Sequence, residues 1–595
     1  MRRGCSLVFS PSYGAKIMRS DLLLPVSISV ASRALIFAFF LTAALACAAQ
    51  TDTTPPTVAI TSPASGATVC GTIPVTASAS DDTGVVGVQF KYNGVDMGAE
   101  DTAAPYAITA FTNNVANGSY SLTAVARDAA GNVTTSAPVT ITVANPTSSF
   151  GSCKFIPAFL VYLGGGPALV ADDAPKLAKF SGIEIDRFRY NEISPGTNTS
   201  WAAIKSFNPN VQIFLYETGT EDSNYHDGTP QAYLNDVDRY NVSRGHPMGS
   251  LNGDHPELFL LDSAGNRIYN TAYSNVTANQ YWNLMDFGAA AYQSYWLTAV
   301  KADIVDGVDA AGQKWVADGV FADSCIAIDF GGYSGVPAKY PTNAQWSGAM
   351  NSFTGTITAG LHVYGQKLWC NRGETRTVDG SAAWRDLDAS ASPPDVLLEE
   401  GAFAVMWGVR DVQFYPEEDW KRQVDTMAAI GNSDVAMISH TKLLEGQAGT
   451  DNWGQPVTFW QTLWYSLGSF LLTKNDQLNN SYFMFNGGSG YDRIWWYDEY
   501  ETIYLGKSVG PYAVTPIDTS NGPVNVYWRE FEKGYVYVNP TPNDVASVTL
   551  PPACQAIPNP CRQRTHDNLP SPPGDLPAVT SIPLSAHNAA IVVKM

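Results

Sequence analysis

Two acidic positions of the sequence close apolar, strand-like runs, where a carboxylate can take part in chemistry. Asp323 follows three apolar residues in ADGVFADS, and Glu399 follows three apolar residues in PDVLLEEG, with Glu400 next to it. A single carboxylate at such a position commonly caps a loop or a helix. Two of them at the ends of separate strands are harder to explain in this way, so we take them as candidate catalytic residues.

A pair of carboxyl groups in one cleft can break a glycosidic bond. One group protonates the leaving oxygen, and the other stabilises or attacks the oxocarbenium-like carbon. Because side chains alternate along a strand, only one of Glu399 and Glu400 can face Asp323. We favour Glu399, since the three apolar residues before it match related barrel motifs, and keep Glu400 as the alternative. The inward glutamate should have a raised pKa if it is the acid.

Other polar residues close further strand-like runs and could bind a sugar. Asn371 and Arg372 end the run between the two acidic positions and could hold a hydroxyl group, orient a carboxylate or merely cap a loop. Further substrate-binding candidates are the donor-rich group Arg187, Arg189, Tyr190 and Asn191, and the individually weaker Tyr216, Glu217, Asp286 and His440. No second histidine stands at ligand spacing from His440, and we expect neither a metal ion nor a cofactor.

These residues need a scaffold that brings strand ends together, and residues 153–515 predict one. Apolar runs alternate there with stretches of helical period, which indicates βα units around a parallel sheet, with helices at 346–361, 417–430 and 459–472. The eight predicted strands begin at Phe159, Ile183, Val211, Gly319, Lys367, Val396, Val435 and Tyr482. Eight units predict a (β/α)8 barrel of the TIM type, whose active site lies at the carboxyl ends of its strands. An insertion at roughly 219–280 is expected over this mouth.

β-rich segments are predicted on both sides of the barrel. Residues 52–145 contain short alternating runs separated by Asn-Gly and other turn signals, which predict a β-sandwich. A linker with Pro and Ser follows at 146–152. Alternating strands return at 520–595, where we expect a C-terminal antiparallel β-sandwich.

Two parts of the chain resemble known families. The stretches SASDDTGVVGVQFKYNG and GSYSLTAVARDAAGN resemble the bacterial immunoglobulin-like modules of secreted carbohydrate-active enzymes. Residues 153–515 resemble hypothetical glycosyl hydrolase family 15 through FRYNEISPGT, PNVQIFLYETG, LMDFG, DGVFADS and DVLLEEG, in that order. This second resemblance implies a retaining-type glycosidase acting on α-linked sugars, with Asp323 as nucleophile and the acid of the sixth strand as proton donor.

Composition and charge restrict the possible partners. The chain has 595 residues, 12% aromatic and 15% charged, and a formal net charge of −20. We therefore expect a poly- or oligosaccharide partner and no nucleic acid. Neither a GxSxG elbow nor an HExxH helix occurs, which argues against a lipase or zinc protease. The alternative to a glycosidase is a non-catalytic carbohydrate-binding or cell-surface protein on a degenerate barrel.

The first 50 residues have the pattern of an export signal, with basic residues ahead of an apolar run at 34–45 and small residues after it. The protein is therefore expected to be secreted or periplasmic. The sequence Ala-Cys-Ala at 46–48 allows either ordinary cleavage or lipid attachment at Cys47 and anchoring at the cell surface. Beyond the leader, no apolar run reaches the about 20 residues of a membrane span.

Export permits disulfide bonds, and the cysteine spacing indicates where to expect them. Cys554 and Cys561 stand close together in PPACQAIPNPC and form the expected bridge. Cys325 and Cys370 follow two separate strands, and could either pair or be small buried residues. In the N-terminal segment, turn carboxylates are a better explanation than calcium ligands for Asp81, Asp82 and Asp128.

Overall fold

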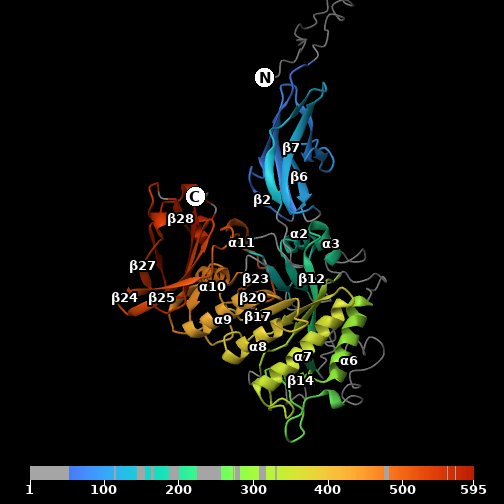
Figure 1. Cartoon of the computed structure of the whole chain (residues 1–595), viewed down its shortest axis with the longest axis vertical. Coiled ribbons are helices and arrows are strands. Elements are labelled where there is room, and N and C mark those ends of the chain that lie inside the picture. Colours follow the sequence, from blue (N-terminus) through green and yellow to red (C-terminus); the bar gives the residue numbers. More distant parts are fainter. Residues whose placement is uncertain are drawn as a thin grey trace, which may run out of the picture. The chain divides into compact units, whose positions relative to one another are not determined.

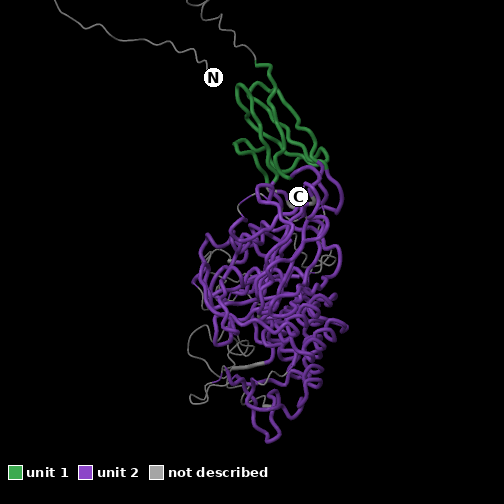
Figure 2. Tube along the Cα trace, turned by 90° about the vertical axis from the view of Figure 1, so that its left-hand side faces the viewer, with its two compact units in different colours: residues 1–63, 75–108, 121–139 green, residues 64–74, 109–120, 140–595 purple. Residues whose placement is uncertain are grey.

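The computed structural model of the chain is shown in Figure 1. It describes residues 52–70, 72–112, 115–143, 155–162, 167–185, 200–223, 256–272, 274, 282–306, 317–328, 332–474, 481–488, 490–558, 560–569, 571 and 573–595. The export signal, the linker and the four candidates between Arg187 and Asn191 lie outside these residues. Figure 2 colours two compact units, residues 1–63, 75–108 and 121–139, and residues 64–74, 109–120 and 140–595.

The N-terminal segment is an immunoglobulin-like β-sandwich, as its alternating runs predict. One sheet has the strand order β1-β3-β6, and the other has the order β2-β9-β7-β4-β5 with β8 beside β7. Val75, Val88, Phe90 and Ala124 are buried and supply its apolar core. The bounds are β1 Thr57–Ser62, β2 Thr68–Val69, β3 Thr72–Ser80, β4 Val85–Tyr92, β5 Val95–Asp96, β6 Tyr106–Phe111, β7 Gly118–Asp128, β8 Val133–Thr135 and β9 Val139–Val143.

Eight parallel strands form the central sheet, and each predicted strand is present. Their order, β10-β11-β12-β15-β16-β17-β20-β23, follows the sequence. Phe483 N donates to Pro157 O at 2.9 Å, so the last strand reaches the first and the sheet nearly closes into a TIM-like barrel. The bounds are β10 Phe159–Tyr162, β11 Gly182–Ile185, β12 Gln212–Thr218, β15 Gly319–Asp323, β16 Lys367–Asn371, β17 Val396–Glu400, β20 Asp434–His440 and β23 Ser481–Asn486.

Aromatic rings fill the inside of this sheet. The Trp369 ring centroid lies 4.9 Å from that of Phe159, 5.0 Å from that of Phe214 and 5.6 Å from that of Phe321. Gly182 leaves room for the indole, because a Cβ atom there would lie 3.3 Å from Trp369 Cζ3. Aromatic rings therefore fill much of the barrel interior, where the register also places the buried Glu184 beside Phe214.

Helices cover the outside of the sheet, and neighbouring pairs from α6 to α10 contact each other. The predicted helices at 346–361, 417–430 and 459–472 correspond to α7, α9 and α10. Thr342, Thr377 and Thr458 cap the N-termini of α7, α8 and α10 with their hydroxyl oxygens. The bounds are α2 Ala174–Leu177, α3 Ser200–Phe207, α6 Ala290–Val300, α7 Asn343–His362, α8 Val378–Asp388, α9 Glu417–Ala429, α10 Phe459–Thr473 and α11 Glu499–Thr502. No described helix is long and apolar enough to cross a membrane.

The insertion after β12 is described in part. Its strand β13 (Glu221–Ser223) pairs antiparallel with β14 (Trp282–Leu284). The chain enters the insertion beside the end of β15, because Gly219 N donates to Asp323 O at 2.6 Å and Thr220 Oγ1 donates to Ser324 O at 2.7 Å. The described start of the insertion is thus attached to the end of β15, the strand that carries Asp323.

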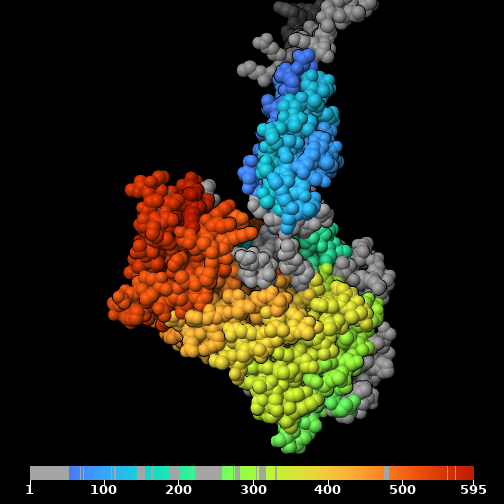
Figure 3. Space-filling view, in the orientation of Figure 1, coloured from blue at the N-terminus to red at the C-terminus, as the bar shows by residue number. Residues whose placement is uncertain are grey.

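The C-terminal region is a five-stranded antiparallel sheet of order β24-β25-β26-β30-β28 with a two-stranded ribbon, β27-β29, on one face. The other face packs on α10, and Figure 3 shows this region and the barrel as one continuous surface. Its first strand begins at Ala513, a few residues before the predicted start. The predicted Cys554–Cys561 disulfide is present, whereas Cys325 and Cys370 are buried free thiols. The bounds are β24 Ala513–Thr519, β25 Gly522–Phe531, β26 Gly534–Asn539, β27 Val545–Thr549, β28 Cys561–Arg564, β29 Ser581–Leu584 and β30 Asn588–Lys594.

Candidate active site

The carboxylates of Asp323 and Glu400 lie close together at the carboxyl ends of β15 and β17. Asn371, the last residue of the intervening strand β16, donates from Nδ2 to Asp323 Oδ1 at 2.8 Å and to Glu400 Oε2 at 2.6 Å. The side chain of Asn371 is buried, whereas Asp323 and Glu400, which it joins, are half-buried and keep some exposure to solvent. The register of the three strands places these residues on the same side of the sheet.

Glu399 lies on the opposite face of β17. It is 3% exposed, and its Oε2 accepts from Thr375 N at 2.8 Å and from Thr375 Oγ1 at 2.6 Å. Our preference for Glu399 as the residue facing Asp323 is therefore corrected, because it is Glu400 that shares a hydrogen-bond donor with Asp323. The count of apolar residues before a glutamate does not determine which face of the strand turns toward the barrel axis.

Two tyrosines and one backbone amide complete the hydrogen bonds of the acids. The Tyr216 hydroxyl donates to Asp323 Oδ2 at 2.6 Å, and the Tyr491 hydroxyl donates to Glu400 Oε1 at 2.5 Å. Ser324 N donates to Asp323 Oδ1 at 2.7 Å. Ser324 has a φ of 60°, a left-handed conformation that residues other than glycine seldom adopt. Such backbone strain directly after a carboxylate is a feature found at functional sites.

Burial shifts the protonation of both glutamates in the same direction. The pKa of the Glu400 carboxyl is raised, first by burial and then by the charge of Asp323, while hydrogen bonds from Tyr491 and Asn371 act against the rise. Burial raises the pKa of Glu399 to about 7, against the hydrogen bonds that it accepts. A raised pKa favours the protonated form of a carboxylic acid, as a proton donor requires. Position, more than pKa, therefore distinguishes the two glutamates.

Aromatic rings lead from Glu400 toward the surface. His440, buried at the end of β20, has its Nε2 3.4 Å from the Tyr491 hydroxyl. The His440 ring centroid is 5.6 Å from that of Tyr491 and 5.6 Å from that of Trp407. Burial lowers the pKa of His440 to about 3, so its imidazole is neutral at ordinary pH. Trp407 is 58% exposed and offers an apolar surface beside His440, on which a ligand ring can stack.

Three of the other predicted residues lie away from this pair of acids. Arg372 is buried, and its Nη2 donates to Asn351 Oδ1 at 2.6 Å, which ties β16 to α7. Asp286 accepts from Lys339 Nζ at 2.6 Å and from the Tyr340 hydroxyl at 2.6 Å. Their contacts are structural. Glu217, also buried, faces the opposite side of β12 from Tyr216.

Sequence reasoning missed Tyr491 and Trp407. Tyr491 stands in the Gly-rich loop after β23, and Trp407 stands between the paired strands β18 (Ala404–Val405) and β19 (Gln413–Phe414), which follow β17. Both loops follow barrel strands, so their position was a usable signal, since βα loops build the active sites of such barrels. The sequence could not predict which residue of each loop reaches the site, because this depends on how the loop folds back over the strand ends.

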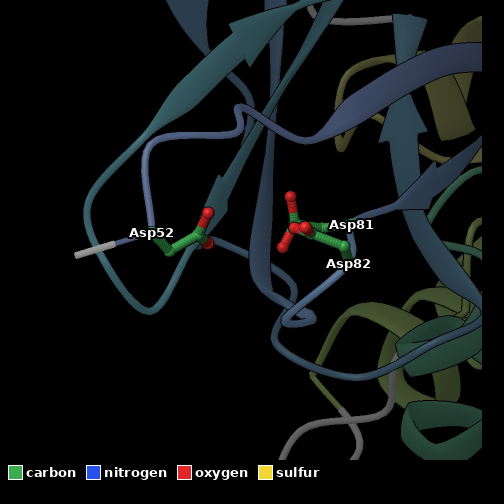
Figure 4. A group of neighbouring side chains, drawn as sticks. All are labelled: Asp52, Asp81 and Asp82. Atoms are coloured by element: carbon green, nitrogen blue, oxygen red, sulfur yellow. The ribbon is translucent and has the colours of Figure 1, made fainter. Parts of the chain in front are cut away.

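One group of carboxylates among the described residues has the spacing of a cation site, and it lies in the N-terminal sandwich. Ligand atoms of Asp52, Asp81 and Asp82 lie within 4.8 Å of one another, and Figure 4 shows these side chains converging. Asp81 Oδ2 also accepts from Thr83 N at 2.9 Å and from Gly84 N at 3.0 Å, as a turn carboxylate does. Asp128 instead accepts from Asn132 N and Nδ2, each at 2.8 Å.

Two protein-family profiles match the chain, one in the N-terminal sandwich and one over the barrel. The profile of the bacterial Ig domain matches residues 56–124, and that of hypothetical glycosyl hydrolase family 15 matches residues 205–535. No curated protein matches the chain.

Two solved structures are similar to short parts of the chain. Fibronectin(III)-like modules of CbhA from Clostridium thermocellum are 29% identical over 15% of this chain and 94% of their own, with a TM-score of 0.14. An endo-beta-1,4-mannanase from Thermotoga petrophila is 17% identical over 16% of this chain and 21% of its own, also with a TM-score of 0.14. The chain thus spans about a fifth of that enzyme. The family match covers more than half of the chain, which therefore belongs to hypothetical glycosyl hydrolase family 15.

Proposed function

We propose that this chain is an exported glycoside hydrolase that uses Asp323 and Glu400 as its catalytic pair. The observation that carries the proposal is the bridge from Asn371 Nδ2 to both carboxylates at the mouth of a TIM-like barrel. Glycosidic cleavage requires two carboxyl groups on either side of the bond. Membership of a hypothetical glycosyl hydrolase family and an immunoglobulin-like module of a bacterial type both support an extracellular enzyme acting on carbohydrate.

Asp323 is suited to act as the nucleophile. Its two carboxylate oxygens accept from Tyr216, Ser324 and Asn371, which orient the group and offset its negative charge. An oriented, ionised carboxylate can attack the anomeric carbon or stabilise its positive charge. The resemblance of the chain to barrel glycosidases assigns the same role to the acidic residue of the fourth strand.

Glu400 is suited to act as the general acid and base. Burial and the neighbouring charge of Asp323 raise its pKa, which favours the protonated carboxyl group that a general acid needs. Tyr491, which donates to Glu400 Oε1, orients the group. After the first step, the ionised Glu400 can remove a proton from the water that completes hydrolysis.

The separation of the acids favours retention of configuration. Asp323 Oδ1 and Glu400 Oε2 lie 2.8 and 2.6 Å from the same atom, Asn371 Nδ2. The distance between these two oxygens therefore cannot exceed the sum of the two hydrogen-bond distances. Retaining enzymes hold their carboxyl groups about 5 to 5.5 Å apart, whereas inverting enzymes need about 6.5 to 9.5 Å for the attacking water. We therefore propose a double-displacement mechanism, on an α-linked sugar as the family resemblance implies.

The direct test is turnover. The purified protein is incubated with soluble α- and β-linked polysaccharides, and the release of reducing ends is compared between the wild type and Asp323→Asn. Release by the wild type alone supports a glycosidase. Binding of a polysaccharide without release of reducing ends by the wild type would instead support a non-catalytic carbohydrate-binding protein.

The stereochemistry of the first product tests the mechanism separately. Proton NMR of the anomeric region, recorded during the first minutes of turnover, distinguishes the anomer released by the enzyme from the one formed later by mutarotation. We expect the first product to keep the configuration of the substrate. An inverted first product would contradict the role of Asp323 as a nucleophile, while leaving the two acids as a catalytic pair.

A further inference from the structure

A pocket that is separate from the Asp323–Glu400 site lies on the outer side of α10, where the barrel meets the C-terminal sheet. Its volume is about 480 Å³, within the range of small-ligand sites. One wall is formed by the hairpin of β21 (Ala448–Thr450) and β22 (Pro456–Thr458) and by the first two turns of α10. The other wall is formed by β28, the turn after it and the segment that leads into β30. None of its lining residues belongs to the Asp323–Glu400 site.

Aromatic rings line this pocket. His566 stacks on Trp460 with ring centroids 3.3 Å apart and an interplanar angle of 15°, and His566 Nδ1 lies 2.9 Å from Glu499 Oε1. Trp464, one helical turn after Trp460, is 5% exposed. Within the described residues, Trp464 Nε1 is a buried donor without an acceptor. A buried N–H group in this state costs free energy unless a ligand or a water molecule accepts its hydrogen bond.

Side-chain amides supply the polar part of the lining. Gln461 Nε2 donates to Ala586 O at 2.8 Å, and Gln447 Oε1 accepts from Leu444 N at 2.9 Å. Each of these amides keeps its other polar atom for a ligand, since no further bond to it occurs within the described chain. Gln563 and Asn588 add two more amides. Groups that both donate and accept suit sugar hydroxyl groups, which do the same.

The guanidinium group at the pocket is already engaged, and the exposed carboxylate of Asp567 also lines the pocket. Arg564 donates from its guanidinium to the carbonyl oxygens of Asn568, Leu569 and Ser571 at 2.7 to 3.1 Å. The guanidinium is therefore used to hold the turn after β28. A phosphate or other anionic ligand would need a cation that is free to move toward it, whereas a neutral ligand needs none.

The walls are held together before any ligand arrives. α10 packs on β26 and β30 so closely that a Cβ atom at Gly468 would lie 2.3 Å from Ala589 Cβ. The Cys554–Cys561 disulfide closes the loop ahead of β28. Preformed walls reduce the entropy lost when a ligand binds.

We propose that this pocket is a second carbohydrate site, which binds one or two units of a neutral oligosaccharide apart from the site of cleavage. It would hold the enzyme on a polysaccharide chain while the barrel mouth acts on it. The choice of ligand class rests on the proposed function, while the location and the polar character of the pocket do not.

The test is affinity electrophoresis of the full chain in native gels that contain soluble starch, galactomannan or xyloglucan. Ser585→Trp fills the pocket from an exposed position, and Gln563→Ala combined with Asn588→Ala removes two amides from its wall. Ser206→Trp, at an exposed position of α3, is the matched control. All variants carry Asp323→Asn in the gels, so that no polysaccharide is consumed.

We expect at least one polysaccharide to retard the Asp323→Asn protein and the Ser206→Trp control equally. Both pocket variants should bind that polysaccharide about tenfold more weakly, the effect of losing about 1.4 kcal/mol of contacts. In a background with Asp323 intact, the pocket variants should keep the wild-type rate on a small aryl glycoside. Equal retardation of all proteins, or retardation of none, overturns the second site. A wild type that cleaves no aryl glycoside would contradict the proposed catalytic site alone, whereas loss of cleavage in the pocket variants only would overturn a second site that is separate from the site of cleavage.

Discussion

At the scale of single residues, Asn371 brings two acids into one site. Without its amide, Tyr216, Ser324 and Tyr491 would still orient the two carboxyl groups, but no donor would lie between them to offset their repulsion. The Nδ2 group offers one hydrogen to each, and so sets their separation while the burial of the site raises the pKa of Glu400. The catalytic role of each acid can therefore be tested by replacing its carboxylate with the amide of the same shape.

Replacing Asp323 by Asn should abolish turnover, because the amide cannot form a covalent intermediate or stabilise positive charge. The change keeps the shape of the side chain and an acceptor for Tyr216, so thermal unfolding should stay within about a few degrees of the wild type. Activity assays and calorimetry on one preparation check both. A variant that unfolds much earlier would identify Asp323 as a structural residue.

The two glutamates should differ in their dependence on the leaving group. Glu400→Gln removes the proton donor, so the rate on poor leaving groups should fall about 10²- to 10⁴-fold, while activated aryl glycosides lose less because their leaving group departs without a proton. Glu399→Gln is the matched control in the same strand and should be nearly silent in rate. If Glu399→Gln alone shows this dependence, the assignment from the geometry is reversed.

Glu399 should instead influence how stability depends on pH. Its pKa rises from 4.5 to about 7 on folding, so between these values the folded chain binds more protons than the unfolded chain and stability falls as pH rises. Glu399→Gln carries no charge at any pH, and the decline in melting temperature between about pH 5 and about pH 8 should become shallower. Calorimetry across this range measures it.

The control for this experiment is Glu418→Gln. Glu418 lies on α9 with 85% of its side chain exposed, and its ion pair with Arg422 Nη2 at 2.8 Å is in contact with solvent. Its replacement should leave the slope of melting temperature against pH unchanged. A steeper decline in Glu399→Gln than in the wild type would contradict the burial of a protonated Glu399.

At the scale of elements, β17 and the turn after it determine which groups surround the Glu400 side chain. The strand directs Leu398 and Glu400 to one side, and the turn after it places Gly401 under the indole of Trp407. A Cβ atom at Gly401 would lie 2.8 Å from Trp407 Cζ3, and its φ is +119°. The close approach holds the indole against Gly401, the residue after Glu400, with more than half of its surface in solvent. An indole held in this way is a ready platform for a sugar ring.

Removing this platform should weaken substrate binding. Trp407→Ala is expected to raise KM for an oligosaccharide about three- to tenfold, the value of one aromatic contact, with kcat little changed because no reacting atom is touched. Trp407→Phe keeps an aromatic face and should recover most of the loss. Steady-state kinetics on one oligosaccharide tests both, and a fall in kcat with unchanged KM would instead place Trp407 in support of Glu400.

At the scale of the whole molecule, the two flanking β regions differ in how they relate to the barrel. The N-terminal sandwich has its own buried core, including Val88 and Phe90. The C-terminal sheet shares its apolar core with the barrel through α10, and Arg529 Nη1 donates to the carbonyl oxygens of Leu471, Leu472 and Lys474 at 2.6 to 3.1 Å. We therefore propose a separable module before residue 150 and an integral one after residue 513.

Matched truncations test this difference. Removal of residues 1–150 should leave a chain that unfolds cooperatively and retains activity, because an independent core is lost as a unit. Removal of residues 513–595 should prevent folding of the barrel, since it exposes the apolar face of α10 and leaves carbonyl groups at its end without donors. Calorimetry and activity are measured for both. A folded, active chain without the C-terminal sheet would contradict its integral role.

The sequence by itself determined the parts that depend on local pattern. All eight barrel strands and three of the helices lie within a few residues of their predicted positions, because runs of buried apolar residues and helical periods are written into neighbouring positions. The candidate Asp323 and the Cys554–Cys561 disulfide likewise follow from short spacings.

Only the tertiary structure decided which side chains meet. Glu399 and Glu400 are neighbours of the same type, and the register of β17 against β16 and β20 turns Glu400 toward Asp323. Asp286, though at a strand end, is held by a loop more than fifty residues away along the chain. Tyr491 reaches Glu400 from a loop 91 residues later. Such contacts depend on strand pairing and chain closure between distant segments, and a shift of one residue in register would reverse every side chain of a strand.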